Sequence, residues 1–112
     1  ELRVVDDQLG SPTYTLDLAM AIGRLIKEPR YGTYHVTNSG SCTWYDLTRD
    51  ILSLAGLDNR VVPISSDEIN RSARRPKFSV LDNFCWRIER LPTLRHYREA
   101  VRDFLHTTKA EG

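Results

Sequence analysis

The sequence has little of what marks several large classes of protein. Its 112 residues include two cysteines, and Cys42 and Cys85 lack the C-x-x-C spacing of zinc and redox motifs. No apolar run approaches the roughly 18 residues that a membrane span needs. The formal net charge of +1 leaves no electrostatic footprint for nucleic acid or an anionic membrane. We therefore expect reduced, packed thiols in a cytoplasmic protein, with neither nucleic acid nor a membrane as partner.

Several signatures of catalysis and cofactor binding are also missing. The histidines, His35, His96 and His106, are far apart and show no H-x-x-x-H or H-E-x-x-H spacing, so no metal site is predicted. There is no G-x-S-x-G, which leaves nucleophilic catalysis without support. There is no G-x-G-x-x-G either, and the scattered glycines offer a dinucleotide no phosphate cradle.

Short apolar runs alternate with helical patterns along the chain, which predicts an α/β fold with few short strands and about four helices. Three short strands make a poor sheet by themselves. The pattern fits the end of a larger doubly wound fold, with residues 1–112 as a single domain. The expected strands are Leu2–Val5, Tyr31–Asn38 and Val61–Ile64, and the expected helices are Thr15 to about Lys27, one capped by Thr43, Leu81–Leu91, and one capped by Thr93.

The helix after Thr43 has the clearest signals at both ends. Asp46 follows Thr43 by three residues, as in a capping box, and Gly56 is a natural residue after the last turn. Its predicted buried stripe consists of Trp44, Leu47, Ile51, Leu54 and Ala55. Tyr45 falls off this stripe, where it either flanks a pocket or faces solvent.

The bend Asp6–Thr13 joins the first strand to the first helix and is rich in groups that can face a ligand. It holds two carboxylates, the Gln8 amide and the Thr13 hydroxyl, together with a glycine that permits close backbone approach. Loops held at strand ends by a rigid frame are where α/β proteins bind ligands. The alternative is a capped turn with solvated acids.

A second polar cluster, residues 70–76, contains Arg71, Arg74 and Arg75 before Pro76. Arginines in a loop form a permanently charged, forked donor set that suits a phosphate or diphosphate. The alternative is a solvated basic loop that pairs with surface acids. Downstream, Ser79 or Asp82 is expected to cap the next helix.

Three blocks, in this order, resemble the dTDP-4-dehydrorhamnose reductases, a family of extended short-chain dehydrogenase/reductases. Residues 4–13 resemble the family's D-Q-x-G-S-P-T turn. Residues 32–45 are similar to its G-x-Y-H-x-x-x-x-G-x-x-S/T-W-Y/F segment, and residues 73–82 to its A-x-R-P-x-x-S-x-L-D block. The resemblance covers essentially the whole chain.

The resemblance implies the substrate-binding, C-terminal part of a Rossmann-type reductase, about its last two-fifths. Such an enzyme reduces dTDP-4-dehydro-L-rhamnose to dTDP-L-rhamnose, a cell-wall and O-antigen precursor, with NADPH bound by an N-terminal half that is absent here. The family's catalytic Tyr-x-x-x-Lys pair is also absent, because no tyrosine of this chain has lysine four residues on. The chain alone is therefore expected to be inactive.

The resemblance also assigns roles to residues. It makes Arg74 or Arg75 the contact to the diphosphate of the sugar nucleotide, and it places Gln8 and Thr13 as polar contacts on the sugar and cofactor side of the cleft. Trp44 is expected to pack. The expected partners are the dTDP-sugar, the N-terminal half and a second copy in a homodimer.

Some members of the family bind Mg²⁺ at a dimer contact, although no residue of this sequence independently indicates that site. The alternative to an enzyme is a non-catalytic subunit of the same fold, like the regulatory subunit of methionine adenosyltransferase. An upstream Tyr-x-x-x-Lys pair would distinguish the enzyme from the subunit.

Overall fold

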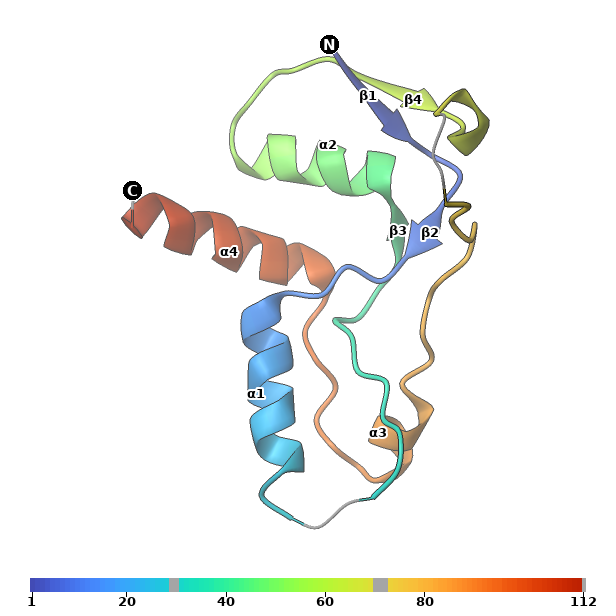
Figure 1. Cartoon of the computed structure of the whole chain (residues 1–112). Helices are drawn as coiled ribbons and strands as arrows, with labels where there is room; N and C mark the ends of the chain where they lie inside the picture. Colours follow the sequence, from blue (N-terminus) through green and yellow to red (C-terminus); the bar gives the residue numbers. More distant parts are fainter. Residues whose placement is uncertain (29–30, 70–72, 112) are drawn as a thin grey trace.

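The structure, a computed structural model, describes residues 1–28, 31–69 and 73–111. Within these residues, four helices and four short strands are connected by long extended segments (Figure 1). This agrees with the predicted α/β class. The elements are β1 (Leu2–Val5), β2 (Leu9–Gly10), α1 (Thr15–Leu25), β3 (Cys42–Thr43), α2 (Trp44–Leu54), β4 (Val61–Ile64), the 3-10 turn η1 (Ser66–Glu68), α3 (Phe84–Ile88) and α4 (Tyr97–Glu111).

The strands β1 and β4 pair in parallel, and α2 lies against both of them. Parallel strands need a crossover connection, and α2 belongs to it. Val4 pairs with Pro63, which the ladder tolerates because a two-stranded sheet consists of edge strands. This unit, at one end of the molecule in Figure 1, confirms the predicted strands Leu2–Val5 and Val61–Ile64.

The predicted signals at both ends of α2 are confirmed. The Thr43 hydroxyl accepts the Asp46 N–H at 3.1 Å, and the Asp46 carboxylate accepts the Thr43 N–H at 3.3 Å. At the other end, Gly56 has φ 71°, and the N–H groups of Gly56 and Leu57 donate to the carbonyls of Ser53 and Leu52. These two bonds form a Schellman motif, which is why the helix stops there.

A clasp of polar side chains joins the start of α1 to the segment before α4. It consists of Asp17, Asn38, Arg95 and Asp103. Arg95 donates to both Asp17 carboxylate oxygens at 2.9 Å and to Asp103 at 2.8 Å. Asn38, only 1% exposed, donates to Asp17 at 2.7 Å. Arg95 is the first cause of the lowered pKa of the Asp17 carboxyl, so Asp17 is held ionised.

The segment 31–38 is not a strand, and that prediction was wrong. Its aromatic and β-branched residues favour an extended chain, but a strand also needs a partner to accept its backbone bonds. The Asn38 N–H instead donates to the Thr13 hydroxyl at 3.3 Å. Only Ser39, just beyond the segment, forms a bridge, with His96.

The last two helices both start later than predicted. Helix α3 covers Phe84–Ile88 rather than Leu81–Leu91, because Asn83 and Arg90 on either side have φ of 59° and 60°. Left-handed residues interrupt a right-handed helix, and asparagine tolerates that conformation well. The residue that precedes α3 is thus Asn83, and neither Ser79 nor Asp82 caps it.

Helix α4 begins at Tyr97, so Thr93 is not its cap. His96 takes that role, with its Nδ1 accepting the Arg98 N–H at 3.1 Å. The residues before it stay extended because Ser39 binds the backbone on both sides of His96: its N–H donates to the Arg95 carbonyl, and its carbonyl accepts the Tyr97 N–H. The sequence around Thr93 does not indicate these bonds, because they come from Ser39, which is distant in the chain.

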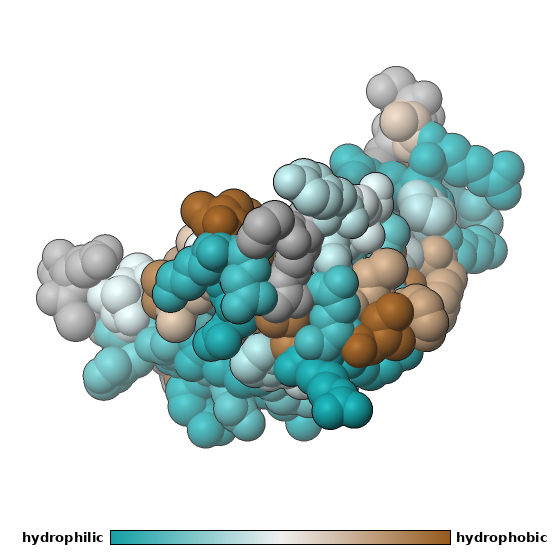
Figure 2. All heavy atoms as spheres, turned by 90° about the horizontal axis from the view of Figure 1, so that it is seen from below, coloured by the Kyte–Doolittle hydropathy of each residue, from teal (hydrophilic) through white to brown (hydrophobic). Residues whose placement is uncertain are grey.

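The core is small for the length of the chain. The solvent-accessible area is 8182 Å², whereas a compact protein of this mass would expose about 6,300 Å². The radius of gyration of 16.2 Å likewise exceeds the value of about 13 Å for a compact domain. Seen from the end where α1 finishes, exposed hydrophobic side chains lie among hydrophilic ones (Figure 2).

Of the two free thiols, Cys42 is buried but Cys85 is exposed, so packing was predicted correctly for Cys42 alone.

Candidate functional site

The candidate site lies beyond the carboxyl ends of β1 and β4. Both strands run in the same direction, so the bend after Val5 and the turn after Ile64 emerge at the same edge. The Asp7 carboxylate accepts the Ser66 N–H at 3.0 Å and the Ser66 hydroxyl at 2.8 Å. These bonds lower the pKa of Asp7 and tie the two connections together. The ends of parallel strands are the usual ligand-binding edge of such sheets.

The segment that follows Arg74 and Arg75 is attached to the bend Asp6–Thr13 by backbone hydrogen bonds. The Leu9 N–H donates to the Lys77 carbonyl at 2.7 Å, and the Leu9 carbonyl accepts the Ser79 N–H at 2.9 Å. The approach is close, since a side-chain carbon on Gly10 would lie 3.2 Å from the Ser79 hydroxyl. On its other side, β2 pairs with β3 in an antiparallel bridge. The two segments that the sequence singled out are therefore neighbours.

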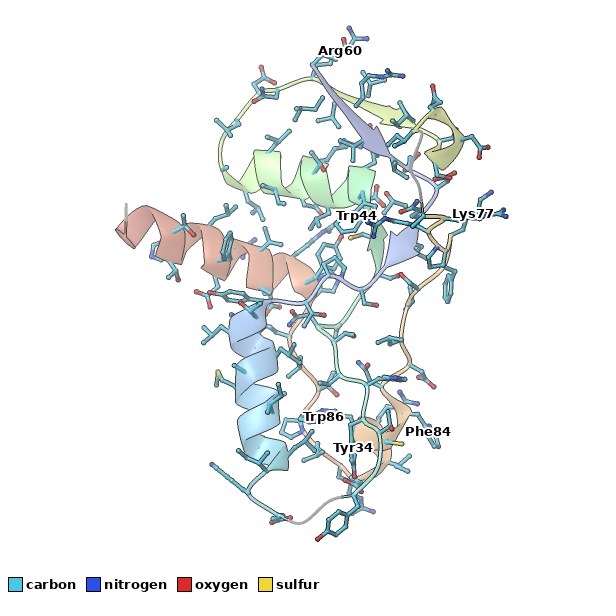
Figure 3. All side chains as sticks on the ribbon, in the orientation of Figure 1. Tyr34, Trp44, Arg60, Lys77, Phe84 and Trp86 are labelled. Carbon is cyan, nitrogen blue, oxygen red and sulfur yellow. The ribbon has the colours of Figure 1, made fainter. Side chains whose placement is uncertain are left out.

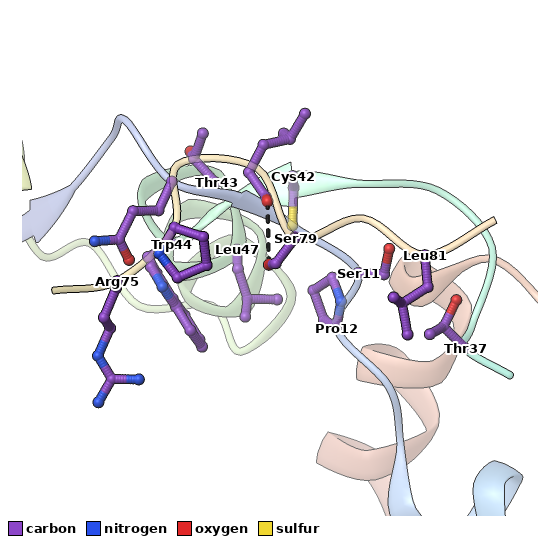
Figure 4. A pocket seen from close by; sticks show the side chains of 14 residues that line it. Ser11, Pro12, Thr37, Cys42, Thr43, Trp44, Leu47, Arg75, Ser79 and Leu81 are labelled. Atoms are coloured by element: carbon purple, nitrogen blue, oxygen red, sulfur yellow. Dashed lines mark hydrogen bonds between the residues drawn. The ribbon is translucent and has the colours of Figure 1, made fainter. Parts of the chain in front are cut away.

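Two hollows adjoin this junction. The first, which we call the apolar hollow, has a volume of about 370 Å³ (Figure 4). The second, the polar hollow, has a volume of about 920 Å³. Gln8, Arg75 and Pro76 line both. The other residues of the apolar hollow are Leu9, Gly10, Ser11, Pro12, Thr37, Cys42, Thr43, Trp44, Leu47, Ser79 and Leu81. Those of the polar hollow are Val5, Ser66, Asp67, Ile69, Ala73, Arg74 and Lys77.

Three of the predicted site residues meet at these hollows, and within the described residues their side-chain polar groups have no partner. Gln8 is 8% exposed, yet no group in the described part of the chain forms a hydrogen bond with its side-chain amide. Arg74 and Arg75 are exposed, and neither forms an ion pair within residues 1–28, 31–69 and 73–111. Arg71, predicted with them, lies outside the described residues. Two guanidinium groups and a shielded amide are thus available to a ligand.

Thr13 and Trp44 do not lie where the sequence indicated. Thr13 lines neither hollow, and its hydroxyl donates to the Ser11 carbonyl at 3.1 Å, which shapes the bend. Trp44 is 52% exposed rather than packed in the stripe of α2. Its side chain lies at the β2–β3 junction, near the apolar hollow (Figures 3 and 4). Helical periodicity predicted that Trp44 is buried because it shows which residues share a face of the helix. It does not show how far the elements packed against that face extend.

The described residues do not form a clustered metal site. No group of three or more His, Cys, Asp or Glu side chains among them is arranged to hold a metal ion. The sequence contains no G-x-G-x-x-G phosphate cradle of the kind that binds a dinucleotide. In the part of the chain that the structure covers, no helix is long and apolar enough to cross a bilayer.

Comparison with known proteins shows which family this chain belongs to. Residues 1–110 match the RmlD substrate binding domain. The chain belongs to this family. It is 44% identical over 106 residues to the spore coat polysaccharide biosynthesis protein SpsK of Bacillus subtilis, covering 94% of this chain and 36% of that protein. It is 43% identical over 99 residues to the dTDP-4-keto-6-deoxy-D-glucose reductase of Streptomyces niveus, covering 88% and 34%.

A solved structure has the same fold. The dTDP-4-dehydrorhamnose reductase of Bacillus anthracis, determined in complex with NADP, superposes with a TM-score of 0.92 at 38% identity, over 95% of this chain and 38% of that one. The chain therefore spans little more than a third of the length of the relatives that it matches. The resemblance noted from the sequence motifs is confirmed at the level of the family.

Proposed function

We propose that the chain is the sugar-nucleotide-binding portion of an NADPH-dependent reductase that converts dTDP-4-dehydro-L-rhamnose to dTDP-L-rhamnose. The observation that carries the proposal is the lining of the polar hollow by Gln8, Arg74 and Arg75, whose side-chain polar groups have no partner among the described residues. Membership of the substrate-binding family supports it. In this proposal Arg74 and Arg75 hold the diphosphate, Gln8 contacts the ligand between the hollows, and Thr13 positions the bend.

The arginine pair suits a diphosphate for electrostatic reasons. Each planar guanidinium can donate two parallel hydrogen bonds to phosphate oxygens. A hydrogen bond to a charged group contributes about 1.5–3 kcal/mol, so loss of one arginine should weaken binding by about tenfold or more. Pro76 follows the pair directly, and Lys77 and Ser79 are bonded to Leu9, so the backbone just after the pair is held in place before a ligand binds.

The catalytic pair and the cofactor belong, in this proposal, to a separate N-terminal dinucleotide-binding half. NADPH would supply the hydride there, and residues 1–112 would bind and orient the sugar nucleotide while being inactive alone. The large exposed area of the chain supports a polypeptide partner of this kind, because 8182 Å² is more than a compact domain of this mass exposes. A cytoplasmic location and a homodimer complete the proposal.

The experiment is dTDP binding to the full protein that carries this chain, measured by calorimetry. Replacing Arg74 or Arg75 with glutamine should raise the Kd for dTDP about tenfold. Arg102→Gln, on the exposed side of α4, removes the same charge elsewhere and is the matched control. Equal affinities for all these variants would contradict the proposed diphosphate site.

Turnover distinguishes an enzyme from a regulatory subunit. The full protein should oxidise NADPH when dTDP-4-dehydro-L-rhamnose is added, and residues 1–112 alone should not. If the full protein binds dTDP but never consumes NADPH, and its upstream sequence lacks Tyr-x-x-x-Lys, the non-catalytic subunit becomes the better description.

A further inference from the structure

The Asp7 side chain joins two connections that leave the β1–β4 sheet at the same edge. Its carboxylate accepts the Ser66 N–H at 3.0 Å and the Ser66 hydroxyl at 2.8 Å, although the two residues are 59 positions apart. Hydrogen bonds to an ionised acceptor are stronger than those between neutral groups. Asp7 is also half-buried, which limits competition from water. It therefore attaches the turn η1 firmly to the bend Asp6–Thr13.

Neither the sheet nor the turn needs this attachment for its own formation. The Asp6 N–H already donates to the Ile64 carbonyl at 2.8 Å, which continues the ladder to the last residue of β4. Within η1, the Glu68 carboxylate accepts the Ser65 N–H at 2.8 Å as part of a capping box. The bonds of Asp7 therefore fix where η1 lies relative to the bend, not whether η1 forms.

The segment that carries Arg74 and Arg75 is attached to the bend at both ends. At its start, η1 is held by the Asp7 carboxylate. At its end, the Lys77 carbonyl accepts the Leu9 N–H at 2.7 Å. The second attachment is made by backbone groups, whereas the first depends on a single side chain. A segment that is held at both ends before a ligand arrives loses less conformational freedom on binding.

We propose that Asp7 is a positioning residue for the diphosphate site, because it holds η1 where this turn and the two arginines line the same hollow. This assignment rests on the proposed function. Ser66 and Asp67 of η1 line the polar hollow together with Arg74 and Arg75. Without Asp7, the turn and the arginine segment sample other arrangements. Affinity then falls in proportion to the fraction of molecules that keep the binding arrangement.

The charge of Asp7 makes the expected effect opposite in sign to an electrostatic one. A carboxylate near an anion site repels the anion, so its removal alone should tighten binding. The pKa of Asp7 is lowered first by the bonds from Ser66 and, to a smaller extent, by the charge of Lys77, which lines the polar hollow. The carboxylate is thus close enough to this hollow for its charge to matter. Weaker binding after removal of Asp7 would therefore come from lost positioning.

The test measures the Kd of the full protein for dTDP and for inorganic pyrophosphate by calorimetry. Asp7→Ala should raise both values about tenfold, as for a site that keeps its binding arrangement about a tenth of the time. Asp7→Asn retains an oxygen that can accept the Ser66 N–H and should restore most of the affinity. Asp67→Ala is the matched control, because it removes a carboxylate that lines the polar hollow and that forms no hydrogen bond or ion pair within the described residues. It should raise neither Kd.

Thermal unfolding of each variant shows that the Kd values refer to folded protein. If Asp7→Ala does not fold, Ser66→Ala tests the same contact from the other side. It removes one hydrogen bond to Asp7 and should raise both Kd values about threefold. Unchanged Kd values in Ser66→Ala would then overturn the positioning role.

The possible results separate the two proposals. The positioning role is wrong if Asp7→Ala raises neither Kd, raises the Kd for dTDP alone, or weakens binding no more than Asp7→Asn or Asp67→Ala does. The proposed function still stands in these cases if Arg75→Gln raises the Kd for both probes. If wild-type protein binds neither probe, or Arg75→Gln changes neither Kd, both proposals fail.

Discussion

Two buried amide side chains, Asn38 in the clasp and Gln8 at the hollows, have opposite hydrogen-bonding environments. The Asn38 amide donates to Asp17 and to the Arg95 carbonyl and accepts the Tyr14 N–H at 2.7 Å. The Gln8 amide has no partner in the described part of the chain. Their exposures are 1% and 8%. Burial alone thus does not tell a structural amide from a ligand-binding one, but hydrogen-bond partners do.

The difference has an energetic meaning. Removing one partner from a saturated buried network leaves other polar groups unpaired, which costs more than the lost bond. Removing a group that has no protein partner leaves nothing unpaired. Substitutions in the clasp should therefore lower the free energy of unfolding, whereas substitutions of Gln8 at the two hollows should weaken ligand binding. Variants of each amide test this division directly.

The largest effect is expected at Asn38. Asn38→Ala removes three side-chain bonds and leaves the Tyr14 N–H unpaired, so it should lower the free energy of unfolding by about 3 kcal/mol. Thermal or urea unfolding measures the change. Asn59→Ala, at an exposed position, is the control and should change stability by less than about 0.5 kcal/mol. If Asn38→Ala lowers the free energy of unfolding no more than Asn59→Ala does, the Asn38 amide does not have the structural role assigned to it.

The charge in the clasp predicts sensitivity to acid. The pKa of Asp17 is lowered below its ordinary value of 3.8 because Arg95 and Asn38 donate to the carboxylate. Its stabilising contribution is therefore complete above pH 3.8 and is lost as the pH falls through the lowered pKa. Asp17→Asn should be less stable at neutral pH and should lose less stability than wild type on acidification. Unfolding midpoints at a series of pH values measure this.

The same series needs a control at an exposed carboxylate. Asp58→Asn changes an exposed aspartate in the connection before β4, so its pH profile should follow that of wild type. If Asp17→Asn and wild type also give parallel profiles, Asp17 does not contribute the acid sensitivity.

At the hollow edge the expected effects are on binding. Gln8→Leu keeps the side-chain volume roughly constant and deletes an amide that has no partner among the described residues, so the free energy of unfolding should change by less than about 1 kcal/mol. Affinity for dTDP-sugar should fall several-fold, as measured by calorimetry on the full protein. Asn38→Leu, the matched replacement in the clasp, should instead unfold readily. If Gln8→Leu strongly lowers the free energy of unfolding and leaves the affinity for dTDP-sugar unchanged, Gln8 is a structural amide and not a ligand-binding one.

The smallest effect concerns the cap of α2, which borders the apolar hollow. Thr43→Ala removes the hydroxyl that accepts the Asp46 N–H and donates to Asp6 at 3.2 Å. Loss of such a cap costs about 1 kcal/mol. Thr43→Ser keeps the hydroxyl and should be close to wild type. Circular dichroism melting curves of the two variants distinguish the cap from the lost methyl group.

Local patterns in the sequence account for most of the helices and for the parallel strands. The capping box at Thr43 and the glycine at position 56 act through bonds to near neighbours, and β1 and β4 are short apolar runs. All of these can be recognised without the fold. The same is true of the arginines before Pro76, whose chemistry is a property of the residues themselves.

Only the tertiary structure decided the rest. The attachment of Lys77 and Ser79 to Leu9, the cap at His96 and the exposure of Trp44 depend on segments far apart in the chain. Residue spacing reports which side chains share one face of an element, but not which element lies opposite that face. The sequence therefore determined the groups available for a diphosphate, and the packing of distant segments determined that they meet at one edge.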